Sequence, residues 1–247
     1  MSGRRVFRIS GDDHVEFLQN LVTNDVTGVR DGLVWAALLT PQGKYLADFF
    51  LVPDDGAILL DVDEALAGDL AQRLSMYKLR AAVSIEPTEI IVSRGLSEPA
   101  EGAFADPRHP DLGWRAYDGR SGEDTDWDAL RVAAEVPESG VELIPNETFP
   151  LEVGFERLHG VDFKKGCYVG QEVTARMKHK TELQKGLRIV DVKGEAPVGT
   201  DVVAEDGRVA GKLYTQANGR GLAYLRFNRA KGALTAGEAA VKLSSSG

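Results

Sequence analysis

The single cysteine of the chain, Cys167, lies in a short basic segment, residues 164–172, which reads KKGCYVGQE. Neighbouring positive charge favours the thiolate over the thiol, so an exposed Cys167 is a candidate for a reactive, redox-sensitive or metal-donating sulfur. Gly166 and Gly170 bracket the thiol and would let the backbone turn sharply or approach a ligand closely. The alternative is a small buried side chain, since free cysteine is among the most buried residue types.

Five lysines around this segment could form a basic lip that attracts an anionic ligand, although a solvated strand face has the same composition. They are Lys164, Lys165, Lys178, Lys180 and Lys185. His159 and His179 lie near Cys167 in the sequence, which makes a cysteine–histidine dyad conceivable. Sequence proximity alone is weak evidence for such a pair.

Charge and composition exclude several classes of protein. The net charge is −9, from 29 basic and 38 acidic residues, which disfavours direct binding to nucleic acid. A single cysteine excludes an intramolecular disulfide, and the sparse histidines do not predict a metal site. No apolar stretch is long enough to span a bilayer, and no apolar signal core follows the N-terminus. We therefore expect a cytoplasmic protein, or a mitochondrial matrix protein if it comes from an organelle.

The elements that must position these residues can be predicted from hydrophobic periodicity. Asp12 and Asp13 precede a short helical pattern, and Asp63 precedes a second with leucines at period four. The other expected elements are strands over 34–39, 45–52, 57–62 and 79–85 and a helix over 126–136. Short strands are expected over 187–192, 201–204, 209–214, 221–227 and 239–243. This order predicts an α+β first half with helices on one face of a sheet, followed by a small all-β unit.

Residues 165–172 resemble the signature of the YgfZ family, folate-binding proteins of iron–sulfur cluster assembly and maintenance. Residues 161–163, 174–176, 17–26 and 39–44 are also similar to that family, so the resemblance covers nearly the whole chain and is weakest over 84–122. The wider superfamily is that of the aminomethyltransferase T-protein of glycine cleavage. It implies two interleaved, ferredoxin-like α+β domains over 1–182 and a small C-terminal β-barrel over 183–247. The three parts would form a trefoil around a central channel that binds tetrahydrofolate.

The resemblance implies site residues as well. Cys167 would carry the thiol chemistry, on a basic, glycine-hinged loop at the mouth of the tetrahydrofolate pocket. The motif residues around it are Lys165, Gly166, Tyr168, Gly170, Gln171 and Glu172. The candidates for folate binding are Glu152, Asp48, Arg115 and Arg176. Glu152 could pair with the amino-pyrimidine edge of a pterin, because a carboxylate can accept two hydrogen bonds.

Several of these side chains, and Arg108 beside them, have other interpretations. Asp48 lies within an apolar strand, where a carboxylate is costly unless paired, so it belongs either on the solvent face or in the site. Arg108 and Arg115 could contact the folate glutamates or a partner, or form surface salt bridges. Tyr168 is expected to fill space beside the thiol, and Gln171 and Glu172 to shape the loop by hydrogen bonding.

Two departures from the T-protein pattern disfavour aminomethyl transfer. The aspartate pair of T-proteins is Ala47-Asp48 here, and their Arg-Leu-Glu-Ala segment is Arg131-Val132-Ala133-Ala134, which lacks the glutamate. Proton transfer at a folate amine needs a positioned acid or base.

We therefore expect a folate-binding accessory factor for iron–sulfur cluster assembly or repair, with an indirect effect on tRNA modification. Its partners would be folate and iron–sulfur proteins or their assembly machinery, with no membrane or direct nucleic-acid contact. One thiol cannot hold a cluster alone, so any cluster contact would be transient. The alternatives are a folate-dependent aminomethyl or one-carbon transferase and a non-catalytic interaction module.

Overall fold

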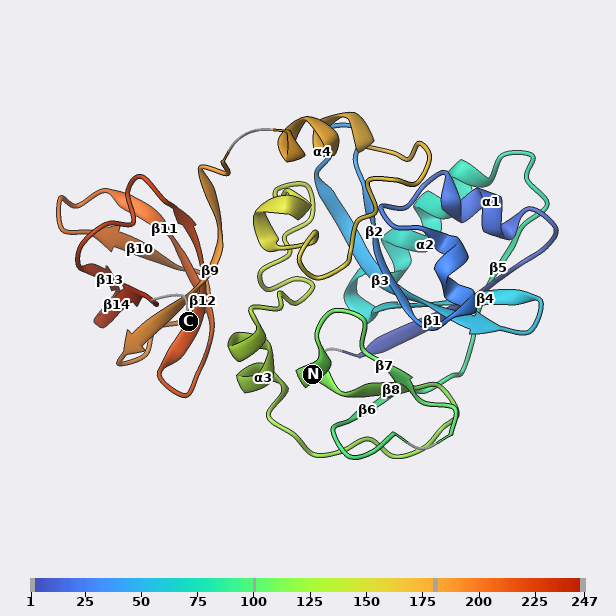
Figure 1. Cartoon of the computed structure of the whole chain (residues 1–247), viewed down its shortest axis with the longest axis horizontal. Helices are drawn as coiled ribbons and strands as arrows, with labels where there is room; N and C mark the ends of the chain where they lie inside the picture. The colour runs from blue at the N-terminus through green and yellow to red at the C-terminus, as the bar shows by residue number, and fades with distance from the viewer. Residues whose placement is uncertain (1–2, 100, 180–181, 245–247) are drawn as a thin grey trace.

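The computed structural model describes residues 3–99, 101–179 and 182–244. Figure 1 shows a closed barrel at the left, a larger sheet with two helices at the right, and a small sheet below them. The architecture is α+β with a C-terminal all-β barrel, as the hydrophobic pattern predicts.

The larger sheet is antiparallel, with strand order β2-β3-β4-β1-β5. Its strands are β1 (Arg4–Ser10), β2 (Val34–Leu39), β3 (Tyr45–Asp54), β4 (Ala57–Asp63) and β5 (Ser84–Pro87). Strands β2, β3 and β4 match the predicted strands to within two residues, whereas β1 was not predicted.

Both faces of this sheet are buried, which explains why β2 is apolar at every position. Val34, Ala36 and Leu38 face a core shared with α1 (His14–Gln19), the 3₁₀ turn η1 (Val26–Arg30) and α2 (Glu64–Lys78). The alternate residues, Trp35, Ala37 and Leu39, face a second core built with the chain between residues 112 and 168. The second core is the one that adjoins the functional residues.

Local chemistry determines where α2 begins and ends. The Asp63 carboxylate accepts a hydrogen bond from the Ala65 backbone N–H at 2.9 Å and caps the first turn. At the other end, Leu79 adopts φ 44° and is 89% exposed. The predicted strand over 79–85 is therefore wrong at its start, since β5 begins only at Ser84.

The middle of the chain forms a small sheet of strand order β6-β8-β7 and several short helices. They are β6 (Ser93–Gly95), β7 (Phe104–Ala105), η2 (Pro110–Leu112), β8 (Trp114–Ala116), α3 (Trp127–Ala134), η3 (Pro150–Val153) and α4 (Gln171–Lys178). Helix α3 was predicted, but α4 was not, because the segment from Lys164 was expected to be a flexible loop.

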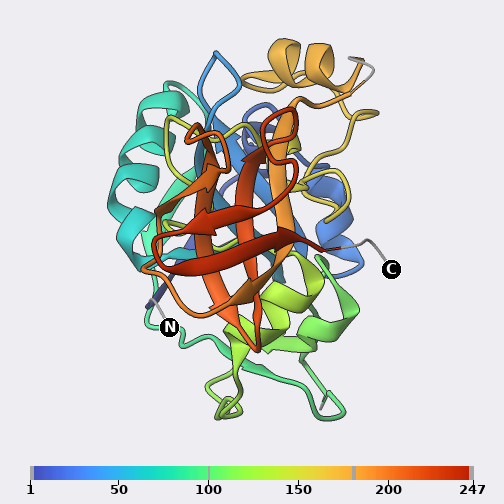
Figure 2. The same cartoon turned by 90° about the vertical axis from the view of Figure 1, so that its left-hand side faces the viewer.

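The C-terminal strands form a closed barrel in the order β10-β11-β12-β9-β14-β13. They are β9 (Lys185–Lys193), β10 (Thr200–Ala204), β11 (Val209–Ala217), β12 (Arg220–Arg226), β13 (Leu234–Ala236) and β14 (Ala239–Leu243). Figure 2 shows the barrel from its outer side, in front of the rest of the molecule, with α4 above it and α3 below. β13 is the one barrel strand that was not predicted, because it has only three residues.

Candidate functional site

Lys165 fixes the cysteine motif to the body of the protein. Its buried ammonium donates hydrogen bonds to the backbone oxygens of Gln19 at 2.8 Å, Val22 at 2.6 Å and Asn24 at 2.9 Å. Burial lowers the pKa of Lys165 to about 8, so the ammonium is retained at neutral pH. These carbonyls belong to the last residue of α1 and to the chain just after it, where unpaired backbone oxygens attract a cation.

The predicted basic lip is consequently wrong. Lys165 points into the protein, while Lys178 and Lys185 each pair with a glutamate. Lys164 is exposed, and Lys180 lies outside the described residues. Lys165, Lys178 and Lys185 diverge because each has its own carbonyl or carboxylate partners.

The thiol lies on the surface. Cys167 is exposed, whereas the next residue, Tyr168, is buried with its ring centroid 5.3 Å from the Lys165 ammonium. The Gln171 amide donates to the Gly166 carbonyl oxygen at 3.3 Å. The loop thus presents the sulfur outward from a segment held on both sides.

The motif packs on the turn between β2 and β3. Two segments that resemble the YgfZ pattern therefore lie against each other. Gly170 has φ +84°, and a Cβ there would lie 2.6 Å from the Thr40 oxygen and 3.0 Å from Gly43 Cα. Gly43 approaches Val173 equally closely. Gly166 has no neighbour within 4 Å of an added Cβ, so only Gly170 requires glycine. Figure 1 shows this turn beside α4.

Asp48 is 3% exposed and is therefore not on a solvent face. It lies opposite Ala37 of β2, on the face of the sheet that carries Trp35 and the second core. Its carboxylate accepts hydrogen bonds from the Trp35 indole at 2.9 Å, the Tyr45 hydroxyl at 2.7 Å and the Ser139 hydroxyl at 2.6 Å. The pKa of Tyr45 is well above its usual value because of its burial and the Asp48 charge beside it. Asp48 is therefore a fully hydrogen-bonded buried carboxylate.

Arg108 and Arg115 are not on the surface, contrary to the expected surface salt bridges. Both guanidiniums bond the buried Asp106, at 2.8 and 3.1 Å, and Arg115 also reaches Asp61 at 3.4 Å. Although burial opposes it, the charge of Arg108 and then that of Arg115 hold the pKa of Asp106 well below its usual range. The Phe50 ring lies 3.9 Å from the Arg115 guanidinium.

The two remaining folate candidates contact the protein itself. Glu152 accepts a hydrogen bond from the hydroxyl of Tyr224 on β12 and pairs with Lys185 at 3.5 Å, which links η3 to the barrel. Burial, and next the hydrogen bond to Glu152, raise the pKa of Tyr224. Arg176 is exposed and pairs with Glu172 one turn earlier in α4, at 2.6 Å.

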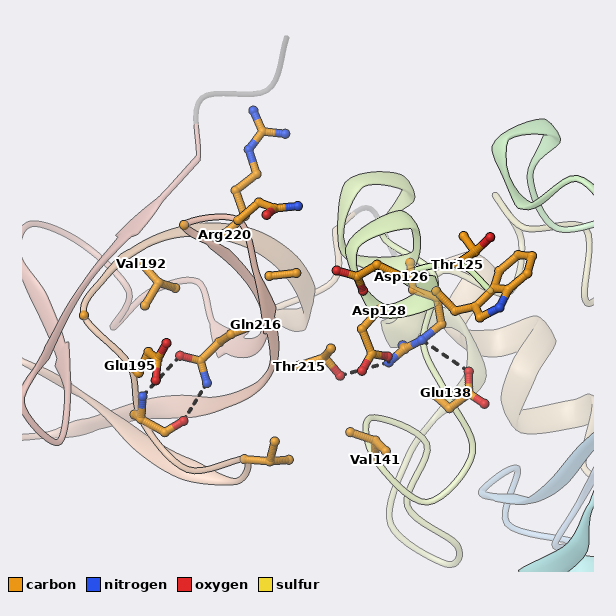
Figure 3. Close-up of a pocket in the computed structure, with 18 of the residues that line it drawn as sticks. Thr125, Asp126, Asp128, Glu138, Val141, Val192, Glu195, Thr215, Gln216 and Arg220 are labelled. Atoms are coloured by element: carbon orange, nitrogen blue, oxygen red, sulfur yellow. Dashed lines mark hydrogen bonds and ion pairs between the residues drawn. The ribbon is translucent and has the colours of Figure 1, made fainter. Parts of the chain in front are cut away.

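A cavity of about 860 Å³ lies between α3 and the barrel, beside their direct contact from Arg131 to Thr215. Figure 3 shows Asp126 and Asp128 on the α3 side and Gln216 and Arg220 on the barrel side. A second cavity of about 620 Å³ lies beside the small sheet and is lined by Arg4 and Arg115. The two cavities share three residues, Arg94, Trp127 and Glu138.

The predicted site residues are only partly brought together. Arg115 lines the smaller cavity, and Asp48 is joined to the wall of the larger one through Ser139. Cys167, Glu152 and Arg176 are not among the residues that line either cavity, so the expected position of Cys167 at the mouth of a folate pocket has no support from these cavities. In both views α4 lies at the top of the molecule and α3 toward the bottom.

Sequence reasoning missed Arg94, Trp127 and Ser139 as wall residues. Trp127 was visible only as the first apolar residue of the α3 pattern. Two polar atoms buried in the described part of the chain have no hydrogen-bond partner, Trp127 Nε1 and Ser93 Oγ. That property depends on packing and leaves no trace in the sequence.

Comparison with known proteins agrees with this architecture. The family model described as "CAF17, C-terminal beta-barrel domain" matches residues 184–246. The iron-sulfur cluster assembly factor IBA57, mitochondrial, of Mus musculus is 34% identical over 95% of this chain and 78% of its own length. The chain belongs to the IBA57 family. The Homo sapiens IBA57 protein is 30% identical, with the same coverage of both chains.

The IBA57-family chain also shares its fold with a more distant protein. The glycine cleavage system aminomethyltransferase T from Bartonella henselae superposes with a TM-score of 0.75, at 12% sequence identity, over 99% of this chain and 83% of the other. The YgfZ-like resemblance and the T-protein-like fold are thereby confirmed.

The described residues of the IBA57-family chain contain no group of three or more His, Cys, Asp and Glu side chains that could hold a metal ion. None of the helices among them is long and apolar enough to cross a membrane.

Proposed function

We propose that this chain acts in iron–sulfur cluster assembly, the role that the names of its IBA57 relatives give to those proteins. Membership of that family supports the general role. The observation that carries the cysteine mechanism is the exposure of Cys167, because a buried sulfur could not reach a cluster or a partner.

Cys167 supplies one thiolate to a cluster that is cargo, not a resident cofactor. Iron–sulfur clusters normally take four cysteine ligands, so a partner protein, a second copy or small thiols provide the others. Ligation releases the thiol proton, since the thiolate is the ligand. The Lys165 anchor and the close contact at Gly170 hold the loop so that the sulfur points outward.

We propose tetrahydrofolate as the occupant of the cavity between α3 and the barrel. Its volume of about 860 Å³ lies within the range of small-molecule sites, roughly 300–1,000 Å³. Its wall combines an aromatic ring with charged groups. Asp48 lies behind this wall and accepts a hydrogen bond from the wall residue Ser139. Arg115 on the neighbouring wall supports the same placement. Glu152 and Arg176 remain predictions without a cavity contact to support them.

The test of the thiol uses cells that lack their own factor of this type. The parent chain should restore the activity of radical and dehydratase iron–sulfur enzymes, and Cys167→Ser should not. Lys164→Met, which changes an exposed residue of the same loop, is the matched control and should restore activity fully. Full restoration by Cys167→Ser would remove the sulfur from the mechanism.

Binding of tetrahydrofolate is measured by calorimetry on the pure protein. The pure protein is also incubated with tetrahydrofolate and an aminomethylated carrier. Formation of 5,10-methylenetetrahydrofolate would indicate a transferase, an activity that Ala47 and Ala133 disfavour. Absence of binding, together with full function in cells, would indicate a non-catalytic interaction module.

Effects on tRNA modification are proposed to be indirect, through iron–sulfur modifying enzymes, in the cytoplasm or the mitochondrial matrix.

A further inference from the structure

Three exposed apolar side chains lie next to one another at the end of α2. Met76 is 60% exposed, Tyr77 is 39% exposed and Leu79 is 89% exposed. They are three of the eight large apolar residues that are exposed in the described part of the chain, and they fall within four consecutive positions. Single exposed apolar residues are ordinary, whereas a cluster of them marks an interaction site.

The fold gains little from these side chains. Helix α2 faces its core through Ala67, Leu70 and Leu74. Met76 lies two positions after Leu74, about 200° further round the helix, and therefore points away from that core. Leu79 has φ 44° and ψ −103°, a region that favours glycine. A leucine that is strained and makes little contact within the protein points to a contact outside it.

Three cations stand among these apolar side chains. Arg73, Lys78 and Arg80 form no ion pair with any residue that the structure describes. Residues 70–85, which include all three, contain no acidic side chain, although the whole chain has a net charge of −9. The surface next to the apolar cluster is therefore locally positive.

The acidic residues around this segment do not neutralise it by pairing. Asp69 precedes it on α2 and Glu86 follows it on β5. Asp13 lies nearest to the loop in space and accepts a hydrogen bond from the Ala82 backbone N–H at 2.7 Å, beside the exposed Asp12. None of these carboxylates forms an ion pair with the three cations. Their counter-charge is left to solvent ions or to an external partner.

The surface of an anionic bilayer fits both properties of the segment. Apolar side chains enter the interfacial region, tyrosine is favoured at that boundary, and lysine and arginine side chains reach the lipid phosphates. A second copy that docked through the same segment would bring two sets of three cations together, which is repulsive. A protein partner would need an acidic groove shaped around a protruding turn, whereas a bilayer adapts to the protrusion.

We propose that the end of α2 and the turn after it bind the surface of an anionic membrane. This α2 patch consists of Arg73, Met76, Tyr77, Lys78, Leu79 and Arg80. Surface binding needs no membrane-spanning helix, and none of the described helices is of that kind. The site differs from the expectation of no membrane contact. In Figure 1, α2 and the chain after it lie on the side of the molecule away from the barrel.

Sedimentation with vesicles tests the patch. The parent chain should bind vesicles that mix phosphatidylglycerol with phosphatidylcholine, should not bind phosphatidylcholine alone, and should be released by salt. Arg80→Gln should weaken binding about fivefold, the contribution of one cation near an anionic surface. Leu79→Gly should weaken it at least about fivefold. Leu79→Gly should also unfold at the same temperature as the parent or a higher one, because glycine tolerates this φ.

Two exposed barrel residues provide matched controls. Leu243→Gly and Lys231→Gln make the same kinds of change outside the α2 patch and should bind vesicles like the parent chain.

A fluorophore placed in the patch reports insertion directly. The three tryptophans of the chain, Trp35, Trp114 and Trp127, are buried, so they lie out of contact with lipid. The indole introduced by Leu79→Trp should shift its emission to shorter wavelength on the mixed vesicles and be quenched by lipids with brominated acyl chains.

The outcomes separate the possible occupants. A parent chain that binds neither kind of vesicle would overturn the membrane surface and leave an acidic protein as the occupant of the patch. Binding that is unchanged in both Leu79→Gly and Arg80→Gln, or an introduced indole that bromine does not quench, would overturn the α2 patch. Neither result bears on the role proposed for Cys167, which is tested in cells.

Discussion

Replacing Lys165 by Met tests whether the motif lysine is an anchor or a charge that serves the thiol. Methionine keeps most of the unbranched stem but removes the ammonium, so three backbone carbonyls lose a donor. The Val22 carbonyl bond is buried and the bonds to Gln19 and Asn24 are half-buried. We therefore expect a loss of free energy of unfolding.

The size follows from these three bonds. An unpaired buried carbonyl costs about 1–3 kcal/mol, and a half-buried one that water can reach about 0.5–1 kcal/mol. Relief of the desolvation that lowers the Lys165 pKa offsets part of this sum. A net loss of about 2–4 kcal/mol remains, which for a chain of this length lowers the melting temperature by roughly 5–15 °C.

Calorimetry and urea unfolding measure the change, with Lys164→Met as the matched control at an exposed neighbouring position. The control should unfold like the parent chain. If Lys165→Met also unfolds like the parent, the ammonium does not hold the loop, and a role in attracting anions would have to be reconsidered.

Three further predictions use the same measurements. Gly170→Ala should cost more than about 2 kcal/mol, from a left-handed φ and a 2.6 Å approach to a carbonyl oxygen, whereas Gly166→Ala should be neutral; equal stability of the two variants would refute the packing. Asp48→Asn should lose about 2–3 kcal/mol, because an amide NH₂ must face one of three donors, and an unchanged urea midpoint would contradict this network. The depressed pKa of Asp106 stabilises the native state above about pH 4, and this stabilisation should be lost progressively as the pH falls below that value. An Asp106→Asn variant that keeps the parent's acid sensitivity would exclude Asp106 as the source of that sensitivity.

Much of the first sheet could be predicted from the sequence because its signals are local. Continuous apolar runs bounded by Pro-Gln-Gly-Lys and Pro-Asp-Asp-Gly turns marked β2, β3 and β4, and Asp63 marked the start of α2. β1 was missed because three arginines interrupt its apolar residues. Arg4 pairs with Asp61 on β4, and Arg8 pairs with Asp54 at the end of β3.

Site residues were predictable by type but not by environment. The motif identified Cys167 and Lys165, yet nothing in it distinguished an exposed sulfur from a buried ammonium two residues away. The side chain of Lys165 turns inward because it bonds backbone carbonyls at the end of α1 and just after it, more than 140 residues earlier in the chain. The same applies to Arg108 and Arg115, whose partners Asp106 and Asp61 could not be paired from sequence.

The sequence by itself determined the family, the α+β order with a C-terminal barrel, and the presence of one thiol in a glycine-rich basic motif. Tertiary structure alone decided which charges are buried, which residues line the cavity between α3 and the barrel, and that Lys165 is buried while Cys167 is exposed. The physical reason is that periodicity and turn chemistry act over a few residues, whereas burial and electrostatic pairing depend on segments far apart in the chain.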